Sequence, residues 1–465
     1  MATTETLSSA ARSELRGLSG EIIGPEDSGY DEARRVHNGM IDRSPGVIVR
    51  ATTSDDVAAA IGFAQSHDVP LAIRGGGHSA PGLGTIDDGV VIDLAPLSTV
   101  TVDADARTVA VGGGATLTQV DAATAQVGMA TPLGILGTTG VGGLTLGGGI
   151  GHLARKHGLT IDNLLGADVV LADGSKVKAS ADENPDLFWA IRGGGGNFGV
   201  VTEFRYRLHP VSTVIAGPTF WSLDDTEAVM RRYREFIPQA PRDLNGFFAF
   251  ATVPPVDPFP AELHGLKVSA VVWCYAGDDN DAAQAAMAPM LDAAEPLLHG
   301  AGPLPFAGLQ GFFDQFYPKG MQGYWRADFV SELPDAAIAA HREHAERMEP
   351  GASTMHMYPI DGAVHDVGEA DTAWSHRDVQ WAEVIYGTEP DPASADSVRK
   401  WTLDYFDATH PYSATGGAYI NFMMDEGQDR VKATYRSNYG RLSRVKAQYD
   451  PENTFRVNQN IQPAV

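Results

Sequence analysis

Cysteine is nearly absent from this chain, because its 465 residues include only Cys274. A single cysteine excludes a disulfide framework and any zinc or iron–sulfur site that needs several thiolates. The sequence also lacks any uninterrupted apolar run of about 20 residues, the length that a membrane-spanning helix needs. The first residues show neither the basic region nor the apolar region of a secretory signal. We therefore expect a cytoplasmic protein without a membrane partner.

Basic residues are scarce as well. The chain has 34 lysine and arginine residues against 59 aspartate and glutamate residues, a formal net charge of −25. A nucleic-acid-binding surface would have to form against this negative field, so we expect no nucleic-acid partner. Because 43% of the residues are apolar and only 20% are charged, the chain can bury at least two cores. Its length predicts two or three domains.

The first 210 residues alternate short strand-like runs with helical ones. Residues 46–50 and 71–74 have strand composition, and Thr53, followed by two acids, marks the start of a helix between them. This order predicts a β-α-β unit. We also predict strands at 90–94, 99–102 and 107–112, a helix at 117–126, and a hairpin around Asp173-Gly174.

The pattern changes after Pro210, where glycine clusters give way to aromatic residues. The later sequence predicts an antiparallel sheet flanked by helices, and thus an α+β fold. We accordingly divide the chain into residues 1–210, 211–414 and a C-terminal segment of 415–465. The predicted strands of the middle part are 244–253, 266–275, 353–358 and 380–386, and its helices include 281–294 and 394–407.

Three glycine clusters lie in the first part, at 75–77, 140–151 and 193–199. Glycine-rich turns let several backbone amides point at one anion, which suits the pyrophosphate of a dinucleotide. Tight turns alone explain one such cluster better than three. The nicotinamide-binding fingerprint G-x-G-x-x-G is disfavoured, because the first cluster ends in His78 and does not open a helix.

Five motifs of this chain, in this order, resemble those of the berberine-bridge-enzyme-like FAD-linked oxidases of the vanillyl-alcohol-oxidase/PCMH flavoprotein superfamily. The resemblance implies a PCMH-type FAD-binding domain in two parts, residues 1–210 and the tail, which clasps a substrate-binding domain. The motifs are Arg74-Gly-Gly-Gly-His-Ser, residues 139–151, residues 158–163, residues 184–202 and Phe455-Arg-Val-Asn-Gln-Asn.

The resemblance also implies a covalent flavin. His78 matches the family histidine that is alkylated by the flavin 8α-methyl group, although a lone histidine is more often an ordinary structural residue. Many members carry a second bond through a cysteine at the position of Leu136, and leucine cannot form that bond. Cys274 falls in a predicted strand of the middle part, where a small buried apolar role is expected. The cofactor implied is therefore FAD attached through His78 alone.

The other residues that the resemblance brings to the flavin belong to the same motifs and to the tail. No metal ligands are implied. The set comprises Arg74, Gly75, Gly76, Gly77, Ser79, Thr138, Thr139, Gly140, Gly142, Gly143, Gly147, Gly199, Val200, Val201, Asn421, Asn458 and Asn460.

Two positions in the second glycine cluster bear on reactivity. Thr139 matches the position that governs oxygen access to the flavin in this family, and a small residue there suits an oxidase, although its hydroxyl could equally bond the backbone. At Ile150 several relatives have a tyrosine that helps to deprotonate the substrate. Isoleucine cannot exchange a proton, so the base must be another residue.

Candidates for that base come from the middle part and the tail. His356 and Tyr358 share one face of a predicted strand, whereas Glu383 could face either the flavin or solvent. Tyr419 belongs to a Tyr-x-Asn segment that resembles the family strand over the flavin ring. Because an unperturbed imidazole titrates nearest neutral pH, His356 ranks first and Tyr419 second, ahead of Glu383 and Tyr358. Ordinary packing remains an alternative for each of them.

The predicted function is an FAD-dependent oxidase that takes a hydride from a carbon bearing a hydroxyl or an amine and reduces molecular oxygen to hydrogen peroxide. The alternatives are a dehydrogenase with another electron acceptor and a flavin-binding protein without turnover. The expected partners are a small-molecule substrate and oxygen. The sequence leaves open whether that substrate is a sugar, an alkaloid or a polyketide-type alcohol, and it leaves the oligomeric state open.

Overall fold

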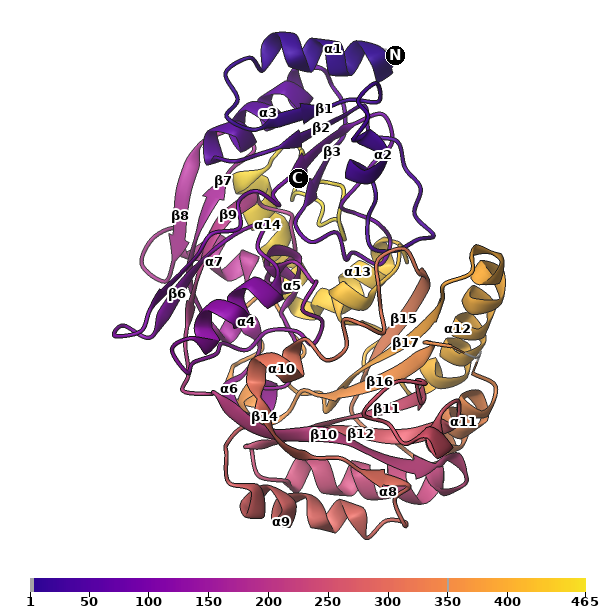
Figure 1. Cartoon of the computed structure of the whole chain (residues 1–465). Helices are drawn as coiled ribbons and strands as arrows, with labels where there is room; N and C mark the ends of the chain where they lie inside the picture. Colours follow the sequence, from indigo (N-terminus) through magenta and orange to yellow (C-terminus); the bar gives the residue numbers. More distant parts are fainter. Residues whose placement is uncertain (1–3, 349–350) are drawn as a thin grey trace.

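The computed structural model describes residues 4–348 and 351–465, which fold into three β-sheets with helices packed against them (Figure 1). The first sheet has the order β1-β2-β4-β3; its last three strands are parallel, and β1 is antiparallel to β2. The predicted cap of α3 is confirmed, because Thr53 forms a capping box with Asp56. The elements are α1 (Thr4–Glu14), β1 (Glu21–Ile23), α2 (Tyr30–Ala33), β2 (Val47–Arg50), α3 (Ser54–Ser66), β3 (Leu71–Arg74) and β4 (Val90–Asp93).

The second sheet is antiparallel and has the order β5-β6-β9-β7-β8. Strands β7 and β8 form the hairpin predicted around Asp173-Gly174, with Gly174 at φ +78°. Helix α5 lies within the second glycine cluster, and α7 ends just before the third. The elements are β5 (Val100–Asp103), β6 (Thr108–Gly112), α4 (Leu117–Ala125), α5 (Val141–Gly147), α6 (Ala154–His157), β7 (Leu164–Val170), β8 (Lys176–Ser180), α7 (Pro185–Ile191) and β9 (Val200–Arg207).

The third and largest sheet is antiparallel, as predicted, with the order β13-β10-β12-β11-β16-β17-β15 and β14 beside β10. Its four predicted strands are all found. The elements are β10 (Thr213–Ser222), α8 (Thr226–Phe236), β11 (Leu244–Thr252), β12 (Lys267–Tyr275), α9 (Asn280–Leu291), β13 (Leu298–His299), β14 (Gly302–Pro305), α10 (Phe306–Gln310), β15 (Gln322–Val330), α11 (Asp335–Glu346), β16 (Thr354–Pro359), β17 (Trp381–Glu389) and α12 (Ala395–Thr409).

The two faces of this sheet have different partners. Phe248, Met355 and Trp381 belong to a core with α8, α9, α11 and α12, whereas Phe247, Tyr358 and Val384 belong to a core shared with the second sheet and the tail. Residues that alternate along β11, β16 and β17 therefore face either the helices or the rest of the chain.

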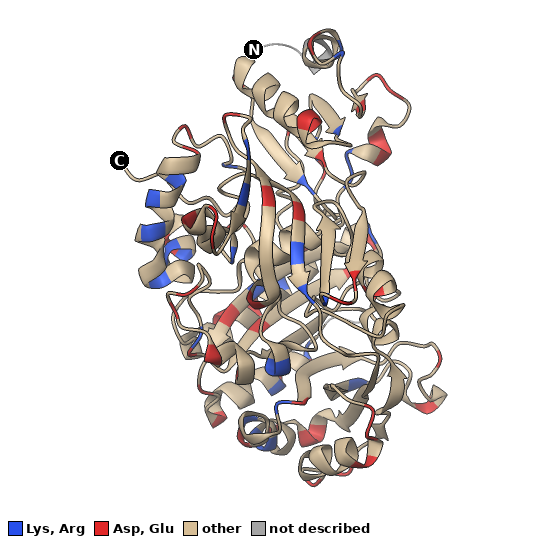
Figure 2. Ribbon diagram, turned by 90° about the vertical axis from the view of Figure 1, so that its left-hand side faces the viewer, with Lys and Arg blue, Asp and Glu red and all other residues tan. Residues whose placement is uncertain are grey.

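The C-terminal segment returns to the first part of the chain (Figure 1). It contains α13 (Gln428–Tyr435) and α14 (Tyr439–Tyr449), and the fully buried Lys446 of α14 donates to the carbonyls of Asn197 and Phe455 and pairs with Asp450. Several of the basic residues lie on α14, beside the C-terminus, whereas acidic residues are spread over the molecule (Figure 2). Among the helices of the described residues, none combines the length and the apolar character needed to cross a bilayer.

Candidate functional site

A cavity of about 340 Å³ lies where all three sheets and the tail meet. One wall comes from the loop after β3 and from the loop before α5. A second wall comes from strands β15, β16 and β17 of the large sheet, and the tail closes the cavity at residues 419–423 and 455–459. Three segments far apart in the sequence thus share one space.

Most of the predicted site residues line this cavity. Three do not. The carbonyl of Thr138 accepts a hydrogen bond from the His78 ring, the carbonyl of Asn460 accepts one from Gln428, and Glu383 lies on the other face of β17. The predicted residues on the cavity wall are Arg74, Gly75, Gly76, Gly77, His78, Ser79, Thr139, Gly140, Gly142, Gly143, Gly147, Gly199, Val200, Val201, His356, Tyr358, Tyr419, Asn421 and Asn458.

The glycine loops touch one another through their backbones. A Cβ on Gly76 would lie 2.3 Å from the amide nitrogen of Gly140, and a Cβ on Gly140 would lie 2.1 Å from that of Gly76. A Cβ on Gly147 would lie 2.2 Å from Oδ1 of Asn421 in the tail. A side chain at Gly76 or Gly140 would push the two loops apart, and one at Gly147 would displace the Asn421 side chain.

Two buried polar atoms on cavity-lining residues lack a hydrogen-bond partner within the described part of the chain. Arg74 donates through Nη2 to Asp93 at 3.0 Å, but its Nη1 is unpaired, and so is Oδ1 of Asn458. Such atoms are costly to bury without a partner. A guanidinium donor beside glycine-rich loops suits a phosphate, and an amide oxygen suits an N–H or O–H donor. The lining therefore fits FAD, which carries both kinds of group.

His78 is held as a neutral imidazole. Burial, with a smaller contribution from His37, lowers its pKa to about 3, although the hydrogen bond to Thr138 acts in the opposite direction. Its Nδ1 lies 3.4 Å from Oγ1 of Thr139. A neutral imidazole keeps one nitrogen lone pair, which an alkylation at this residue would require.

Two positions that depart from the family pattern line the cavity. They are Leu136, where many members form a second flavin bond, and Ile150, where several relatives have a tyrosine. Cys274 lies outside the cavity, fully buried on β12, and burial raises the pKa of its thiol to about 12. The one cysteine of the chain is thus a protonated apolar side chain away from the cavity.

His356 and Tyr358 point to the cavity from β16, and Nδ1 of His356 lies 2.7 Å from the hydroxyl of Tyr358. Burial lowers the pKa of His356 to about 3, so the condition for its first rank, an unperturbed imidazole, is not met. Burial also raises the pKa of Tyr358 well above 10, and Tyr317 and Tyr419 add to that shift. The pair is therefore uncharged over the physiological range of pH.

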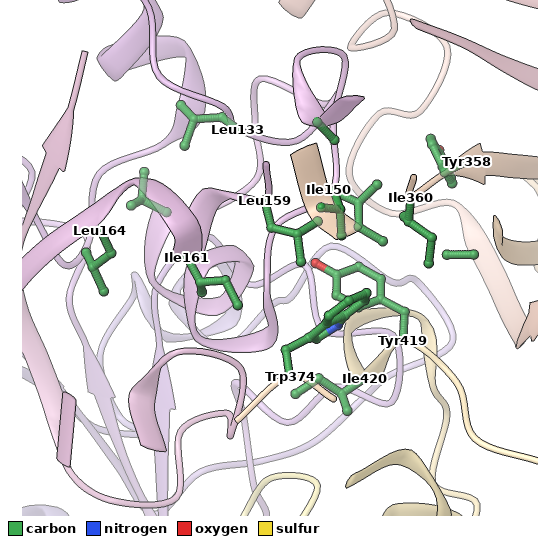
Figure 3. Packing of buried hydrophobic residues seen from close by; sticks show 14 of the residues in the cluster. Leu133, Ile150, Leu159, Ile161, Leu164, Tyr358, Ile360, Trp374, Tyr419 and Ile420 are labelled. Atoms are coloured by element: carbon green, nitrogen blue, oxygen red, sulfur yellow. The ribbon is translucent and has the colours of Figure 1, made fainter. Parts of the chain in front are cut away.

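Tyr419 lies between Ile150 and Trp374, with its hydroxyl on the side of the glycine loop (Figure 3). Its hydroxyl oxygen accepts hydrogen bonds from the backbone N–H of Gly149 and from Nδ2 of Asn421, both at 2.8 Å. Burial raises its pKa to about 12, and these donated bonds oppose that rise because they stabilise a phenolate.

Glu383 is not part of the cavity, so its prediction as a site residue is wrong. The alternation along β17 places Val384 on the cavity wall and Glu383 on the opposite face, beneath α11 and α12. There Glu383 accepts from the hydroxyl of Thr409 and lies 3.4 Å from Nε2 of His341. Burial, reinforced by Asp328, raises its pKa to about 8.

The cavity-wall residues that the sequence did not single out include a stacked pair of rings, a further tyrosine beside one of them and a histidine whose ring contacts His78. Trp325 and Tyr386 stack with ring centroids 4.1 Å apart, and Tyr317 lies beside Tyr386 at 5.7 Å. His37 packs against His78, with the two rings tilted by 34°. Alternation along β17 could have identified Tyr386, which shares a face with Val384, but Tyr317 and His37 lie in loops without a local signal.

Two family profiles match segments of the chain that line the cavity. A family profile described as "FAD binding domain" matches residues 45–180, and one described as "Berberine and berberine like" matches residues 418–462. An uncharacterized FAD-linked oxidoreductase of Bacillus subtilis is 30% identical over 96% of this chain and 97% of its own length. The (R)-6-hydroxynicotine oxidase of Paenarthrobacter nicotinovorans is 28% identical, with 96% and 97% covered.

Two solved structures show the same fold. The 6-hydroxy-D-nicotine oxidase from Arthrobacter nicotinovorans superposes with a TM-score of 0.85 at 25% identity, covering 96% of this chain and 99% of that one. The glucooligosaccharide oxidase from Acremonium strictum superposes with a TM-score of 0.85 at 24% identity, covering 100% of both chains. The flavin of that enzyme is described as a 6-S-cysteinyl, 8α-N1-histidyl FAD.

Proposed function

Because the chain belongs to the berberine-bridge-enzyme-like FAD-linked oxidoreductases of the PCMH-type flavoprotein superfamily, we propose that it is an oxidase that takes a hydride from a carbon bearing a hydroxyl or an amine and reduces oxygen to hydrogen peroxide. The observation that carries this proposal is the cavity in which the His78 loop, the glycine loops and the tyrosines of β16 and the tail meet. Relatives that act on hydroxynicotine and on oligosaccharides support it.

We infer that the glycine loops and the tail hold FAD, which supplies the hydride-accepting chemistry when bound. The loops at Gly76 and Gly140 offer backbone amides, and the free Nη1 of Arg74 offers a cationic donor for phosphate. Asn458 offers its unpaired amide oxygen from the tail.

His78 is the proposed attachment point, and the only one. Its imidazole is buried and neutral, so a ring nitrogen is available as a nucleophile. Leu136 lines the cavity and has no group that could form a second bond, and Cys274 is buried elsewhere. A single covalent bond distinguishes this chain from the glucooligosaccharide oxidase, whose flavin is both cysteinyl and histidyl.

Tyr419 is the proposed proton acceptor. A base beside the reacting carbon must take the hydroxyl or amine proton as the hydride leaves, and this typically contributes about 10²–10⁴ in rate. Two donated hydrogen bonds stabilise the phenolate of Tyr419, whereas the pKa of Tyr358 is raised further. His356 is a poorer acceptor than the sequence suggested, because its protonated form is strongly disfavoured by burial. We therefore rank Tyr419 ahead of the His356–Tyr358 pair.

The opposite wall suits a substrate that contains a ring. Trp325 and Tyr386 form a stacked pair on β15 and β17, and Tyr317 extends the same aromatic surface. Ring faces bind flat or ring-shaped groups by stacking. This wall supports both an aromatic alcohol or amine and a sugar ring as substrate.

The experiment is anaerobic reduction of the purified flavoprotein by a panel of aromatic alcohols, cyclic amines and oligosaccharides, followed by rapid mixing with air. An oxidase returns to the oxidised spectrum and yields one hydrogen peroxide per flavin. If the reduced flavin persists in air but is reoxidised by an artificial acceptor, the protein is a dehydrogenase. If no compound of the panel reduces the flavin, the oxidase proposal loses its support in favour of a flavin-binding role.

A further inference from the structure

A second histidine ring packs directly against His78. The ring centroids of His37 and His78 are 3.9 Å apart, with an angle of 34° between the planes, and both residues line the cavity. His37 lies in the loop between α2 and β2, 41 positions before His78, so the contact is tertiary and not a consequence of sequence proximity.

The fold fixes His37 from two sides. Its backbone N–H donates to the carbonyl of Gly77, the residue just before His78, at 3.0 Å. Its carbonyl accepts from the N–H of Gly320 at 2.8 Å, and its Nε2 lies 3.1 Å from the carbonyl of Tyr317. A carbonyl only accepts, so Nε2 of His37 carries the proton and donates it.

His37 therefore joins the His78 loop to the segment that leads into β15 of the large sheet. Rotation of the His37 ring would break its bond to Tyr317. The His78 ring packs against His37 with ring centroids 3.9 Å apart, and its Nδ1 lies 3.4 Å from Oγ1 of Thr139. The His78 imidazole thus contacts both His37 and Thr139.

We propose that His37 is a positioning residue for flavin attachment, and that its ring is the wall that holds the His78 imidazole in the orientation needed for bond formation. This inference rests on the proposed covalent bond at His78. In that step a His78 ring nitrogen bonds the flavin 8α carbon, and one C–H and one N–H bond are lost. The two protons and two electrons released pass to molecular oxygen, which becomes hydrogen peroxide. Precise placement of the nucleophile is worth large factors in the rate of such a step.

Two substitutions separate the ring of His37 from its hydrogen bond. His37→Phe keeps a flat ring against His78 and loses the donor to Tyr317. His37→Gln keeps a donor of similar reach and loses the ring. If the ring is the positioning element, His37→Gln attaches flavin at least tenfold more slowly than the wild type, whereas His37→Phe stays within about threefold.

The matched control is His209→Gln. His209 also stacks on a histidine, His157, with ring centroids 3.8 Å apart, and neither of these two residues lines the cavity. His209→Gln removes a comparable contact between two histidine rings and leaves His37 and His78 unchanged. We therefore expect attachment at the wild-type rate in His209→Gln.

The measurement follows covalent incorporation and does not depend on turnover. The full-length chain is made in riboflavin-starved cells, mixed with FAD in air, and sampled over time for flavin fluorescence in denaturing gels. Total FAD bound before denaturation is measured in parallel, which separates slow attachment from weak binding or misfolding. A wild-type protein that never retains flavin in the gel removes the covalent proposal itself. If the wild type retains flavin and His37→Gln attaches it at the same rate, the His37 ring has no positioning role. The same conclusion follows if His37→Phe and His37→Gln slow attachment equally. Both outcomes leave the covalent bond at His78 in place.

Discussion

Replacement of Tyr419 by phenylalanine tests the proposed proton acceptor, because it removes one oxygen atom from the cavity wall. In the wild type, burial raises the pKa of this phenol to about 12, so at pH 8 about one molecule in 10⁴ carries the phenolate. If the phenolate accepts the substrate proton, flavin reduction speeds up by about tenfold per pH unit between pH 7 and 10. Tyr419→Phe then loses this pH dependence and about 10²–10⁴ in rate, or roughly 2.7–5.5 kcal/mol of barrier.

The same substitution has a structural cost that must be separated from catalysis. It leaves the N–H of Gly149 and Nδ2 of Asn421 without their shared acceptor, at about 1–3 kcal/mol for each buried donor. Tyr405→Phe is the control, because Tyr405 is also fully buried and its hydroxyl forms a hydrogen bond, to His341, away from the cavity. The assay is anaerobic stopped-flow reduction across pH, with flavin content and Tm measured for both variants. A Tyr419→Phe protein that holds its flavin and reduces it at the wild-type rate and pH dependence would refute the role of Tyr419 as base.

Three further predictions concern other parts of the structure. Thr139→Leu fills space beside His78 and should slow reoxidation by air while anaerobic reduction stays nearly unchanged; equal reoxidation rates would remove its proposed role in oxygen access. Burial raises the pKa of Glu383 from 4.5 to about 8, so the folded chain keeps its proton over a pH range in which the unfolded chain loses it. The free energy of unfolding therefore falls by up to about 5 kcal/mol as pH rises from about 4.5 to 8. Glu383→Gln should abolish that part of the fall in Tm between about pH 5 and 9. Parallel Tm curves would contradict this. Gly76→Ala should lower FAD content severalfold because its Cβ meets the backbone of Gly140, whereas Gly62→Ala, with open space around it, should not; equal FAD content would contradict the loop packing.

Local patterns predicted much of the fold, and the reason is physical. The cap at Thr53 and the hairpin at Asp173-Gly174 depend on a few neighbouring residues, so the sequence specifies them directly. Alternation likewise placed His356 and Tyr358 on one face of β16. Such patterns are short-range, and the structure reproduces them.

The errors and omissions arose where distant segments meet. The alternating pattern predicts two faces of β17, but it does not predict which of them α11 and α12 cover. The prediction of Glu383 as a site residue was wrong for this reason. The low pKa of His356 comes from burial by the whole fold and from no neighbour in sequence. His37 and Tyr317, which are joined by a hydrogen bond, lie 280 residues apart. Their part in the cavity is visible only after the chain has folded.

The most direct test of the account is the mass of the intact, denatured protein together with a map of its peptides. We expect a polypeptide heavier by one covalently bound FAD, with the flavin on the peptide that contains His78 and on no other. His78→Ala should then release all of its flavin on denaturation. A denatured wild-type chain with the mass of the unmodified polypeptide, or a flavin found on a peptide without His78, would contradict it.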